Sequence, residues 1–364
     1  MSEYYISVEP EFEGTYWCER CIQGIKQEAA RSKRAVVQIG FNDKAELEAL
    51  SKTEHPVLIL VSSRVDRIVD AVRCCALYGI RCITMTAPVN DMDYSVSTIS
   101  MDYRSAFESM IEYMAERGQH RAALFGVHPN SVNDLEKMRS FRICTGSEDI
   151  YLNNGNSAET CDMFFSKIKE YDGVICTNDI IAIRLRDYLK SRNDDIPIYA
   201  IGETRTSQLI RPGITTAALD FHSIGRHSVK LCNMLMKDPE LTELHMKLSC
   251  EIYSEGRSVN VNKVRKKDTI HNNSTAEAED FYEDKEIETV FRLENLISHC
   301  LKEDFRILRG IMTEKSYSEI ASECYIAENT LKYRLKRMFD LSGCENRREL
   351  MDLVGRYLSE KDIV

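Results

Sequence analysis

The chain has 364 residues, 43% of them hydrophobic, and a formal net charge of −10, which is ample for two or three globular domains. It has no run of about 18 apolar residues, which argues against a membrane span, and its N-terminus lacks the basic and apolar regions of a signal peptide. We therefore expect a cytoplasmic protein whose thirteen cysteines are thiols. The common nucleotide-binding, hydrolase and zinc-protease motifs are missing, so we expect no catalysis, metal or cofactor.

Short β-rich runs alternate with amphipathic stretches from residue 4 to about residue 258. A first set contains the runs YYISV, AVVQIG, PVLILVSS and RCITMT, and a second set contains RAALFGV, DGVICT and PIYAIG. This alternation predicts an α/β fold in which helices cover both faces of parallel sheets. Two sets predict two similar lobes and a cleft, lined by loops at the carboxyl ends of the strands.

The composition changes after residue 258. Residues 259–285 are polar, acidic and poor in aliphatic side chains, which is typical of a linker, and residues 286–364 are predicted to be helical. The first helix of this part carries apolar residues at helical spacing, namely Ile287, Val290, Phe291, Ile297 and Leu301. This stripe predicts either the first helix of a terminal domain or a dimer contact.

Residues 316–339, SYSEIASECYIAENTLKYRLKRMF, predict two short helices joined by a tight turn. Ser316 and Glu319 can cap the first helix reciprocally, and Gly343 can end the second. One face of the second helix is apolar and should pack on a core, through Leu331, Leu335, Met338 and Phe339.

The opposite face of the second helix is polar and basic. Such a face can enter the major groove of double-stranded DNA, where cations neutralise phosphates and Asn or Arg reads base edges. A solvated basic surface is the alternative, but the capped helix before it and the apolar helix after it favour DNA binding. The candidate DNA contacts are Asn329, Thr330, Lys332, Tyr333, Lys336 and Arg337.

The segment from about residue 305 to residue 358 resembles the LuxR-type helix-turn-helix domain. Three elements of that family occur here in order and spacing, as Glu319-Ile320-Ala321, Asn329-Thr330-Leu331-Lys332 and Asn346-Arg347-Arg348-Glu349-Leu350. The resemblance implies DNA binding through the second helix. Ala327 replaces the Ser that usually caps this helix, which should weaken the cap by about 1 kcal/mol. Leu331 stands where Val is common.

Residues 4–258 resemble the regulatory domain of the lac/gal-repressor family, which is similar to periplasmic sugar-binding proteins. The resemblance is carried by segments such as STISMDYRSAFESMIEYMAERGQHRAALFG, DGVICTNDIIAIRLRDYL and RPGITTAALDFHSIGRHSVKLCNMLM. It implies a periplasmic-binding-protein-like fold whose cleft binds a small molecule, often a sugar or nucleobase. The candidate ligand-binding residues are Trp17, Ser62, Asp102, Lys137, Asn178 and Asp179.

The sequence departs from the repressor family at three positions. Lys137 replaces the Arg that grips the ligand, Thr204 replaces an acidic residue, and Ser140 replaces a Gly. A lysine lacks the bidentate fork of arginine. The ligand is therefore unusual, or the cleft has lost small-molecule binding.

Structural roles remain open for several of the candidate ligand-binding residues. Asn178, Asp179 and Asp102 can each serve as helix N-caps, and Trp17 can simply pack in a core or an interface.

The sequence as a whole predicts a transcription regulator with domains at 1–258 and 286–364, joined by a linker at 259–285. A homodimer is expected, because two DNA-binding domains on two half-sites multiply the affinity. In the alternative, the large domain is a ligand-free dimerisation or protein-interaction module. A transporter's solute-binding protein is disfavoured, because it would need a signal peptide and has no use for a basic terminal helix.

Overall fold

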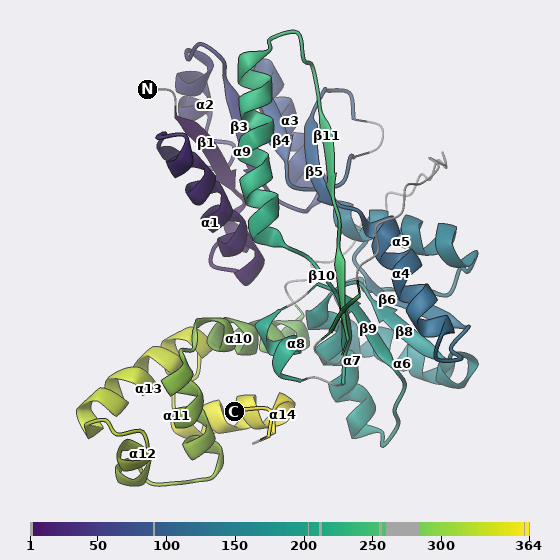
Figure 1. Cartoon of the computed structure of the whole chain (residues 1–364), viewed down its shortest axis with the longest axis vertical. Helices are drawn as coiled ribbons and strands as arrows, with labels where there is room; N and C mark the ends of the chain where they lie inside the picture. Colours follow the sequence, from purple (N-terminus) through teal and green to yellow (C-terminus); the bar gives the residue numbers. More distant parts are fainter. Residues whose placement is uncertain are drawn as a thin grey trace.

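The computed structural model describes residues 3–89, 92–202, 204–210, 213–254, 257–259, 284–359 and 361–363. In Figure 1, these residues form two α/β lobes and a group of C-terminal helices beside the second lobe. None of the helices in these ranges is both long and apolar enough to cross a membrane. The α/β class and the C-terminal helical region predicted from the sequence are confirmed.

The first lobe contains a parallel sheet in the order β11-β5-β4-β3-β1-β2. Helices α1 and α9 cover one face of this sheet, and α2 and α3 cover the other. The strands are β1 (Tyr4–Val8), β2 (Val36–Ile39), β3 (Val57–Val61), β4 (Arg81–Thr84), β5 (Ser97–Met101) and β11 (His245–Leu248). The helices are a 3-10 turn (Pro10–Phe12), α1 (Tyr16–Arg31), α2 (Lys44–Ser51), α3 (Val65–Leu77) and α9 (Phe221–Lys237).

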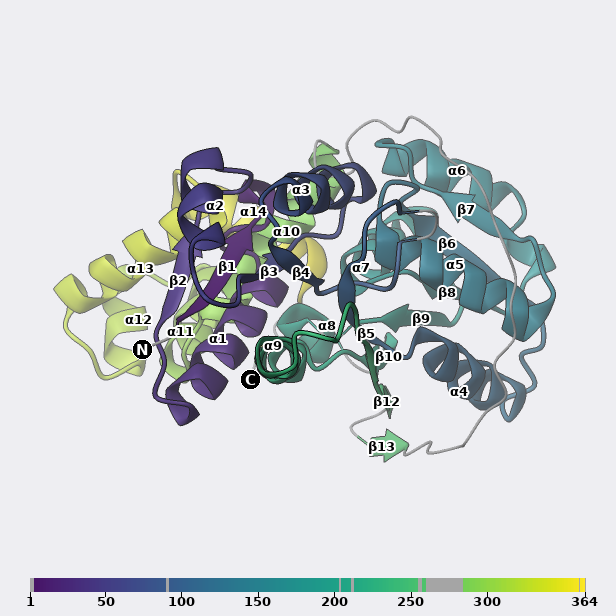
Figure 2. The same ribbon diagram turned by 90° about the horizontal axis from the view of Figure 1, so that it is seen from above.

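The second lobe contains a sheet in the order β13-β12-β10-β9-β8-β6-β7, parallel except at β12 and β13. Helices again lie on both faces, as the view in Figure 2 shows. The strands are β6 (Ala122–Val127), β7 (Ile150–Leu152), β8 (Gly173–Cys176), β9 (Ile198–Ile201), β10 (Thr215–Ala218), β12 (Glu251–Ser254) and β13 (Arg257–Val259). The helices are α4 (Tyr103–Ala115), α5 (Val132–Thr145), α6 (Ser157–Ser166), a 3-10 turn (Ile168–Glu170), α7 (Asp179–Ser191) and α8 (Arg205–Leu209).

The chain crosses between the lobes three times, after β5, after β10 and after β11. The lobes are also joined by backbone hydrogen bonds away from these crossings. Val65 N–H donates to the carbonyl of Asn130 at 2.9 Å, and Val132 N–H donates to the carbonyl of Ser63 at 2.9 Å. These bonds fix one edge of each lobe against the other, so the space between the lobes has a defined width.

Helices α1 and α9 cross with almost no space between their backbones. A Cβ atom on Gly24 would come within 2.1 Å of the carbonyl oxygen of His222, and one on Gly225 within 1.9 Å of the carbonyl oxygen of Cys21. Only glycine at both positions permits this approach. The crossing fixes α1, which carries several residues of the candidate site described below.

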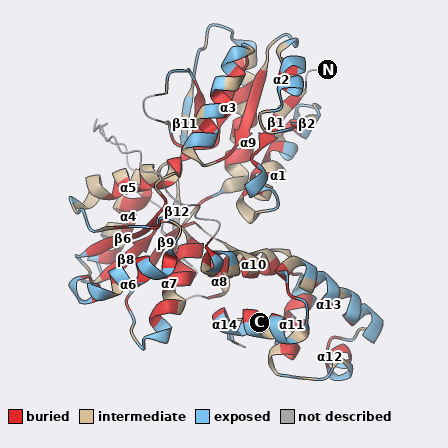
Figure 3. Cartoon of the chain, turned by 180° about the vertical axis from the view of Figure 1, so that it is seen from behind, coloured by how far each residue is buried: buried red, intermediate tan, exposed pale blue. Residues whose placement is uncertain are grey.

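The described residues of the C-terminal part form five helices, each with both buried and exposed residues (Figure 3), and the buried residues are mostly apolar. The helices are α10 (Lys285–His299), α11 (Lys302–Met312), α12 (Tyr317–Glu323), α13 (Glu328–Ser342) and α14 (Arg347–Tyr357). The predicted reciprocal cap is present: Glu319 N–H donates to Ser316 Oγ at 3.3 Å, and Ser316 N–H donates to Glu319 Oε2 at 2.7 Å. Ala327 provides no side-chain cap for α13, and Gly343 ends that helix with φ 61°.

Helix α10 packs against the second lobe and the other C-terminal helices at the same time. Its residues Ile287, Val290, Leu293, Leu296 and Ile297 are fully buried in one apolar core shared with that lobe. The predicted stripe is therefore mostly used within the chain, and Leu301, which is 53% exposed, falls outside it. These contacts leave little of the predicted stripe free for a dimer.

Most of the predicted linker lies outside the described residues, at 260–283. Its last two residues belong to the helical part, because α10 begins at Lys285. Asp284 caps that helix by accepting from the backbone N–H groups of Glu286 and Ile287.

Substitution of Gly225 by Ala should lower the stability of the first lobe by about 1–3 kcal/mol, because the new Cβ forces α1 and α9 apart. The midpoint of denaturant-induced unfolding measures this effect. Gly355→Ala in α14 is a matched control, since nothing lies within 4 Å of its Cβ position, and it should not destabilise the chain. Equal midpoints for Gly225→Ala and the wild type would contradict the role of the crossing.

Candidate functional site

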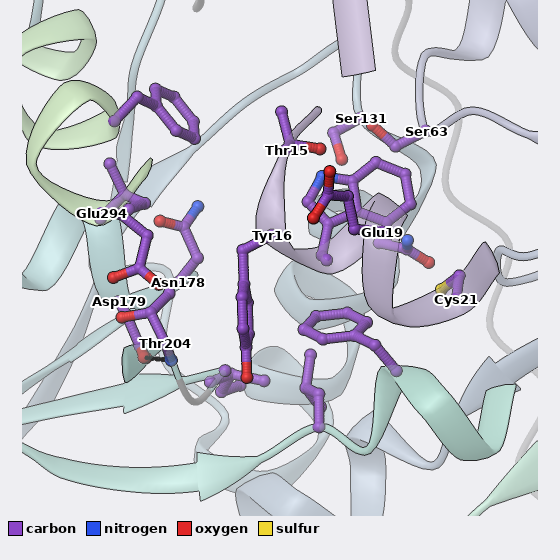
Figure 4. A pocket seen from close by; sticks show the side chains of 18 of the residues that line it. Thr15, Tyr16, Glu19, Cys21, Ser63, Ser131, Asn178, Asp179, Thr204 and Glu294 are labelled. Carbon is purple, nitrogen blue, oxygen red and sulfur yellow. Dashed lines mark hydrogen bonds between the residues drawn. The ribbon is translucent and has the colours of Figure 1, made fainter. Parts of the chain in front are cut away.

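A cavity of about 670 Å³ lies between the two lobes. Loops at the carboxyl ends of strands line it, as predicted: Ser63 after β3, His128 after β6, Asn178 after β8 and Gly202 after β9. The beginning of α1 forms a second part of the wall, and α10 forms a third. Figure 4 shows Tyr16 extending between the side chains of the two lobes.

Trp17 is the chain's single tryptophan and lines the cavity half-buried. Its ring packs edge-on against Phe12, with ring centroids 5.0 Å apart, and tilted against Phe221, with centroids 6.3 Å apart. An aromatic ring held in this way offers a platform for the apolar face of a small molecule. Trp17 therefore both packs against other aromatic rings and lines the cavity, whereas the sequence left these two placements as alternatives.

Lys137 lines the cavity but is held by the protein itself. It is only 5% exposed, and its Nζ donates to Asp134 Oδ1 at 2.9 Å and to the carbonyl oxygen of Thr177 at 2.8 Å. Asp134 Oδ2 accepts from the backbone N–H of His128 at 3.1 Å. An ammonium group has three N–H donors, so one donor remains beyond these two bonds.

Of the two residues considered as helix caps, Asn178 has that role, whereas Asp179 contacts the beginning of α8. Asn178 caps α7 by accepting from Ile181 N–H at 3.0 Å, and both residues line the cavity. Asp179 is 1% exposed, and its Oδ2 accepts from Thr204 N–H and Ser207 Oγ, each at 2.5 Å. Thr204, where the repressor family has an acidic residue, caps α8.

Glu294 of α10 is a buried carboxylate at the cavity, 4% exposed. Its oxygens accept from the backbone N–H of Arg205 at 3.1 Å and of Thr206 at 2.8 Å, at the beginning of α8. Burial raises the pKa of Glu294 to about 7; the negative charge of Asp179 adds to the rise, and the hydrogen bonds oppose it. This carboxylate joins the C-terminal helices to the second lobe.

Ser62 and Asp102 do not belong to the described lining of the cavity. Ser62 is fully buried beside it and donates to Glu9 Oε2 at 2.5 Å. Asp102 lies where the chain crosses between lobes, and it caps α4 by accepting from Ser105 N–H at 3.2 Å. Successive side chains of an extended segment point to opposite sides. Ser63 therefore lines the cavity, while its neighbour Ser62 points away from it.

Several lining residues were not among the candidates from the sequence. His128, Asn133 and Asp134 lie just after β6 or at the beginning of α5. The sequence could have indicated this position, because ligands in α/β folds bind beyond the carboxyl ends of the strands. Phe221 begins α9 after a crossing between the lobes. The sequence gave no indication that residues of α10 line the cavity, because their spacing does not show that this helix packs at the cleft.

The candidate DNA contacts form one exposed face of α13. Asn329, Thr330, Lys332, Tyr333, Lys336 and Arg337 are all exposed, and Tyr333 is 73% exposed. The opposite face is buried through Leu331, Leu335 and Met338, as predicted. Arg337 also donates to the carbonyl oxygen of His299 at 3.1 Å, so part of its guanidinium group is already bound within the protein.

Helix α10 also holds the C-terminal end of α13. The Arg292 guanidinium donates to the carbonyl oxygens of Ser342 at 2.7 Å and Gly343 at 3.1 Å, and the Asn295 amide donates to that of Leu341 at 2.7 Å. A cation at the C-terminus of a helix also complements the helix dipole. The same helix therefore contacts the cavity on one side and the end of α13 on the other.

Within the described ranges, no group of three or more His, Cys, Asp and Glu side chains is arranged to hold a metal ion. The described cysteines form no disulfide with one another, and most of them are buried.

The raised pKa of Glu294 makes the docking of α10 sensitive to pH. Because the folded pKa of about 7 exceeds the ordinary value of 4.5, the stability linked to this group is complete below pH 4.5 and declines as pH rises through about 7. We expect Glu294→Gln to reduce this decline, measured as unfolding midpoints between about pH 5 and about pH 8. Glu288→Gln, an exposed change on the same helix, controls for the lost charge; parallel profiles for Glu294→Gln and wild type would contradict this.

Comparisons with known proteins agree with this architecture. A family model described as "Periplasmic binding protein-like domain" matches residues 111–259. The chain is 22% identical over 198 residues to the HTH-type transcriptional regulator pepR1 of Lactobacillus delbrueckii subsp. lactis, which covers 49% of this chain and 56% of the relative. It is 20% identical over 161 residues to catabolite control protein A of Staphylococcus epidermidis, covering 41% of this chain and 49% of the relative. The chain thus spans about half the length of the curated relatives it matches.

Solved structures share the two-lobed fold. The transcriptional regulator CelR in complex with cellobiose superposes with a TM-score of 0.57 at 12% identity, covering 69% of this chain and 84% of the other. PepR1 and CelR are both named as transcriptional regulators. Residues 111–259 thus match a periplasmic-binding-protein-like domain, and the two lobes of this chain share their fold with the solved regulator.

Proposed function

We propose that this chain is a cytoplasmic, DNA-binding transcription regulator whose sensor domain responds to a small molecule. The exposed polar face of α13 is the observation that carries the proposal. It presents cations and amide or hydroxyl groups on one side of a helix whose other side is anchored in a core. This is what a recognition helix needs to enter a major groove.

We further propose that α12 and α13 form a LuxR-type helix-turn-helix. Its support is the agreement of the three sequence elements with the helices: Glu319 to Ala321 lie in α12, Asn329 to Lys332 in α13, and Asn346 caps α14. Two such domains in a homodimer would bind two half-sites of double-stranded DNA.

A sugar or another polyhydroxylated molecule is the effector class that the cavity favours. Carboxylates and amides, such as those of Asp179 and Asn178, suit ligand hydroxyl groups, and Trp17 suits the apolar face of a sugar ring. The complex of CelR with cellobiose gives a precedent for this fold.

A ligand-free sensor domain is the second candidate function. Lys137 favours it, because the group that replaces the family's ligand-gripping Arg is already bound to Asp134 and Thr177. In that case the large domain serves dimerisation or protein interaction. A panel of sugars and nucleobases distinguishes the two: a ligand at 100 times its dissociation constant stabilises the fold by about 2.7 kcal/mol, and no shift in melting temperature with any of them favours the ligand-free module.

Substitution of Lys336 by Ala should weaken DNA binding across sequences and reduce the slope of log affinity against log salt by roughly 1, because one phosphate contact is lost. Fluorescence anisotropy with duplex DNA at several salt concentrations measures the slope. Lys302→Ala removes an exposed cation from α11, outside the proposed contact face, and should leave the slope unchanged. An unchanged slope for Lys336→Ala would remove Lys336 from the phosphate contacts.

A further inference from the structure

One wall of the cavity comes from the C-terminal helical part rather than from the sensor lobes. Helix α10 contributes Glu288, Phe291, Arg292, Glu294, Asn295 and His299 to the lining. Figure 4 shows Glu294 on the same side of the cavity as Asn178, Asp179 and Thr204 of the second lobe. The cavity is thus a composite of three parts of the chain, of which one also carries the proposed DNA-binding helix.

Each neighbour of α10 is held by a specific contact. Glu294 accepts from the backbone of α8 in the second lobe, and Arg292 and Asn295 donate to the end of α13. His299 Nε2 lies 3.4 Å from Glu19 Oε2 of α1 in the first lobe, an ion pair when the imidazole is protonated. Helix α10 therefore contacts both sensor lobes and α13 at once.

We propose that the effector binds α10 directly, so that the C-terminal helical domain is part of the effector site. This inference rests on the proposed sensing function and adds residues that decide the ligand's specificity. Phe291 adds a second aromatic side chain to the lining, and Glu288 and Asn295 supply acceptors and a donor. The site then suits a polyhydroxylated molecule with one apolar face on Trp17 or Phe291 and hydroxyl groups toward the carboxylates.

A shared wall couples the effector to α13 without any intermediate domain. An effector that contacts both the lobes and α10 stabilises their docked arrangement through its own binding free energy. The coupling is reciprocal, so DNA that favours another position of α13 lowers the affinity for the effector by the same factor.

The single tryptophan allows a direct test in the full chain. Cellobiose, glucose and galactose are titrated while the fluorescence of Trp17 is recorded, and the dissociation constant is compared between the wild type and Phe291→Ala. Loss of one aromatic contact should weaken binding about tenfold. Thr289→Ala is the matched control on the same helix, since Thr289 does not belong to the described lining, and it should bind as the wild type does. Glu288→Ala, an exposed position, replaces Phe291→Ala if that variant does not fold, and weaker binding is again expected.

The possible outcomes separate this inference from the proposed function. A sugar that binds the wild type, Phe291→Ala and Glu288→Ala equally overturns the role of α10, while the sensing function stands. If none of the three sugars changes the fluorescence, the proposed effector class fails. A measurement without ligand then tests whether α10 forms a wall of the cavity. In that measurement, Glu294→Lys should break the hydrogen bonds of α10 to the beginning of α8, loosen this wall and make Trp17 more accessible to quenching by acrylamide. Unchanged quenching would show that α10 does not wall the cavity, and would overturn the inference.

Discussion

The docking of α10 onto the second lobe is the interaction on which the rest of the arrangement depends. Five fully buried apolar side chains of α10 join the core of that lobe, each contributing about 1.5–3 kcal/mol relative to exposure. Polar contacts set the orientation: Glu294 binds the beginning of α8, and Arg356 of α14 reaches Asp187 of α7 at 2.7 Å and Glu286 of α10 at 2.6 Å. Without this contact, α13 would have no fixed position and the cavity would lose a wall.

The charges around the cavity follow from the same arrangement. Carboxylates outnumber cations in its lining, and the two cations are turned to protein acceptors: Lys137 to Asp134 and Thr177, Arg292 to the end of α13. Oδ2 of Asp179 and both carboxylate oxygens of Glu294 instead accept hydrogen bonds from N–H or O–H donors. The cavity therefore presents acceptors to a ligand more readily than cations, which suits neutral hydroxyl groups better than an anion.

The sequence predicted the fold well because the fold depends on local periodicity. The βαβ alternation, the Ser316–Glu319 cap and the apolar face of α13 are all local patterns, and each matches the structure. Strand ends likewise placed Asn178 and Asp179 at the cavity. Ser62 and Asp102 do not belong to the described lining, because one residue of strand alternation decides which way the side chain of Ser62 points, and Asp102 caps α4 where the chain crosses between the lobes. The wall formed by α10 was missed because it depends on contacts between residues far apart in the chain, such as Glu294 with Thr206.

The continuous core between the second lobe and the C-terminal helices has a consequence for proteolysis. The two parts are joined in sequence through residues 260–283, but they are held together in space by buried side chains and by bonds such as that of Ser157 N–H to Asp284 Oδ2 at 2.5 Å. The covalent connection mainly raises the effective concentration of one part near the other. A protease that cut the chain between residues 260 and 283 would therefore leave the C-terminal helices bound to the second lobe as a non-covalent complex. The nicked protein would keep α13, the proposed DNA-binding helix, and the apolar surface of the second lobe would stay covered.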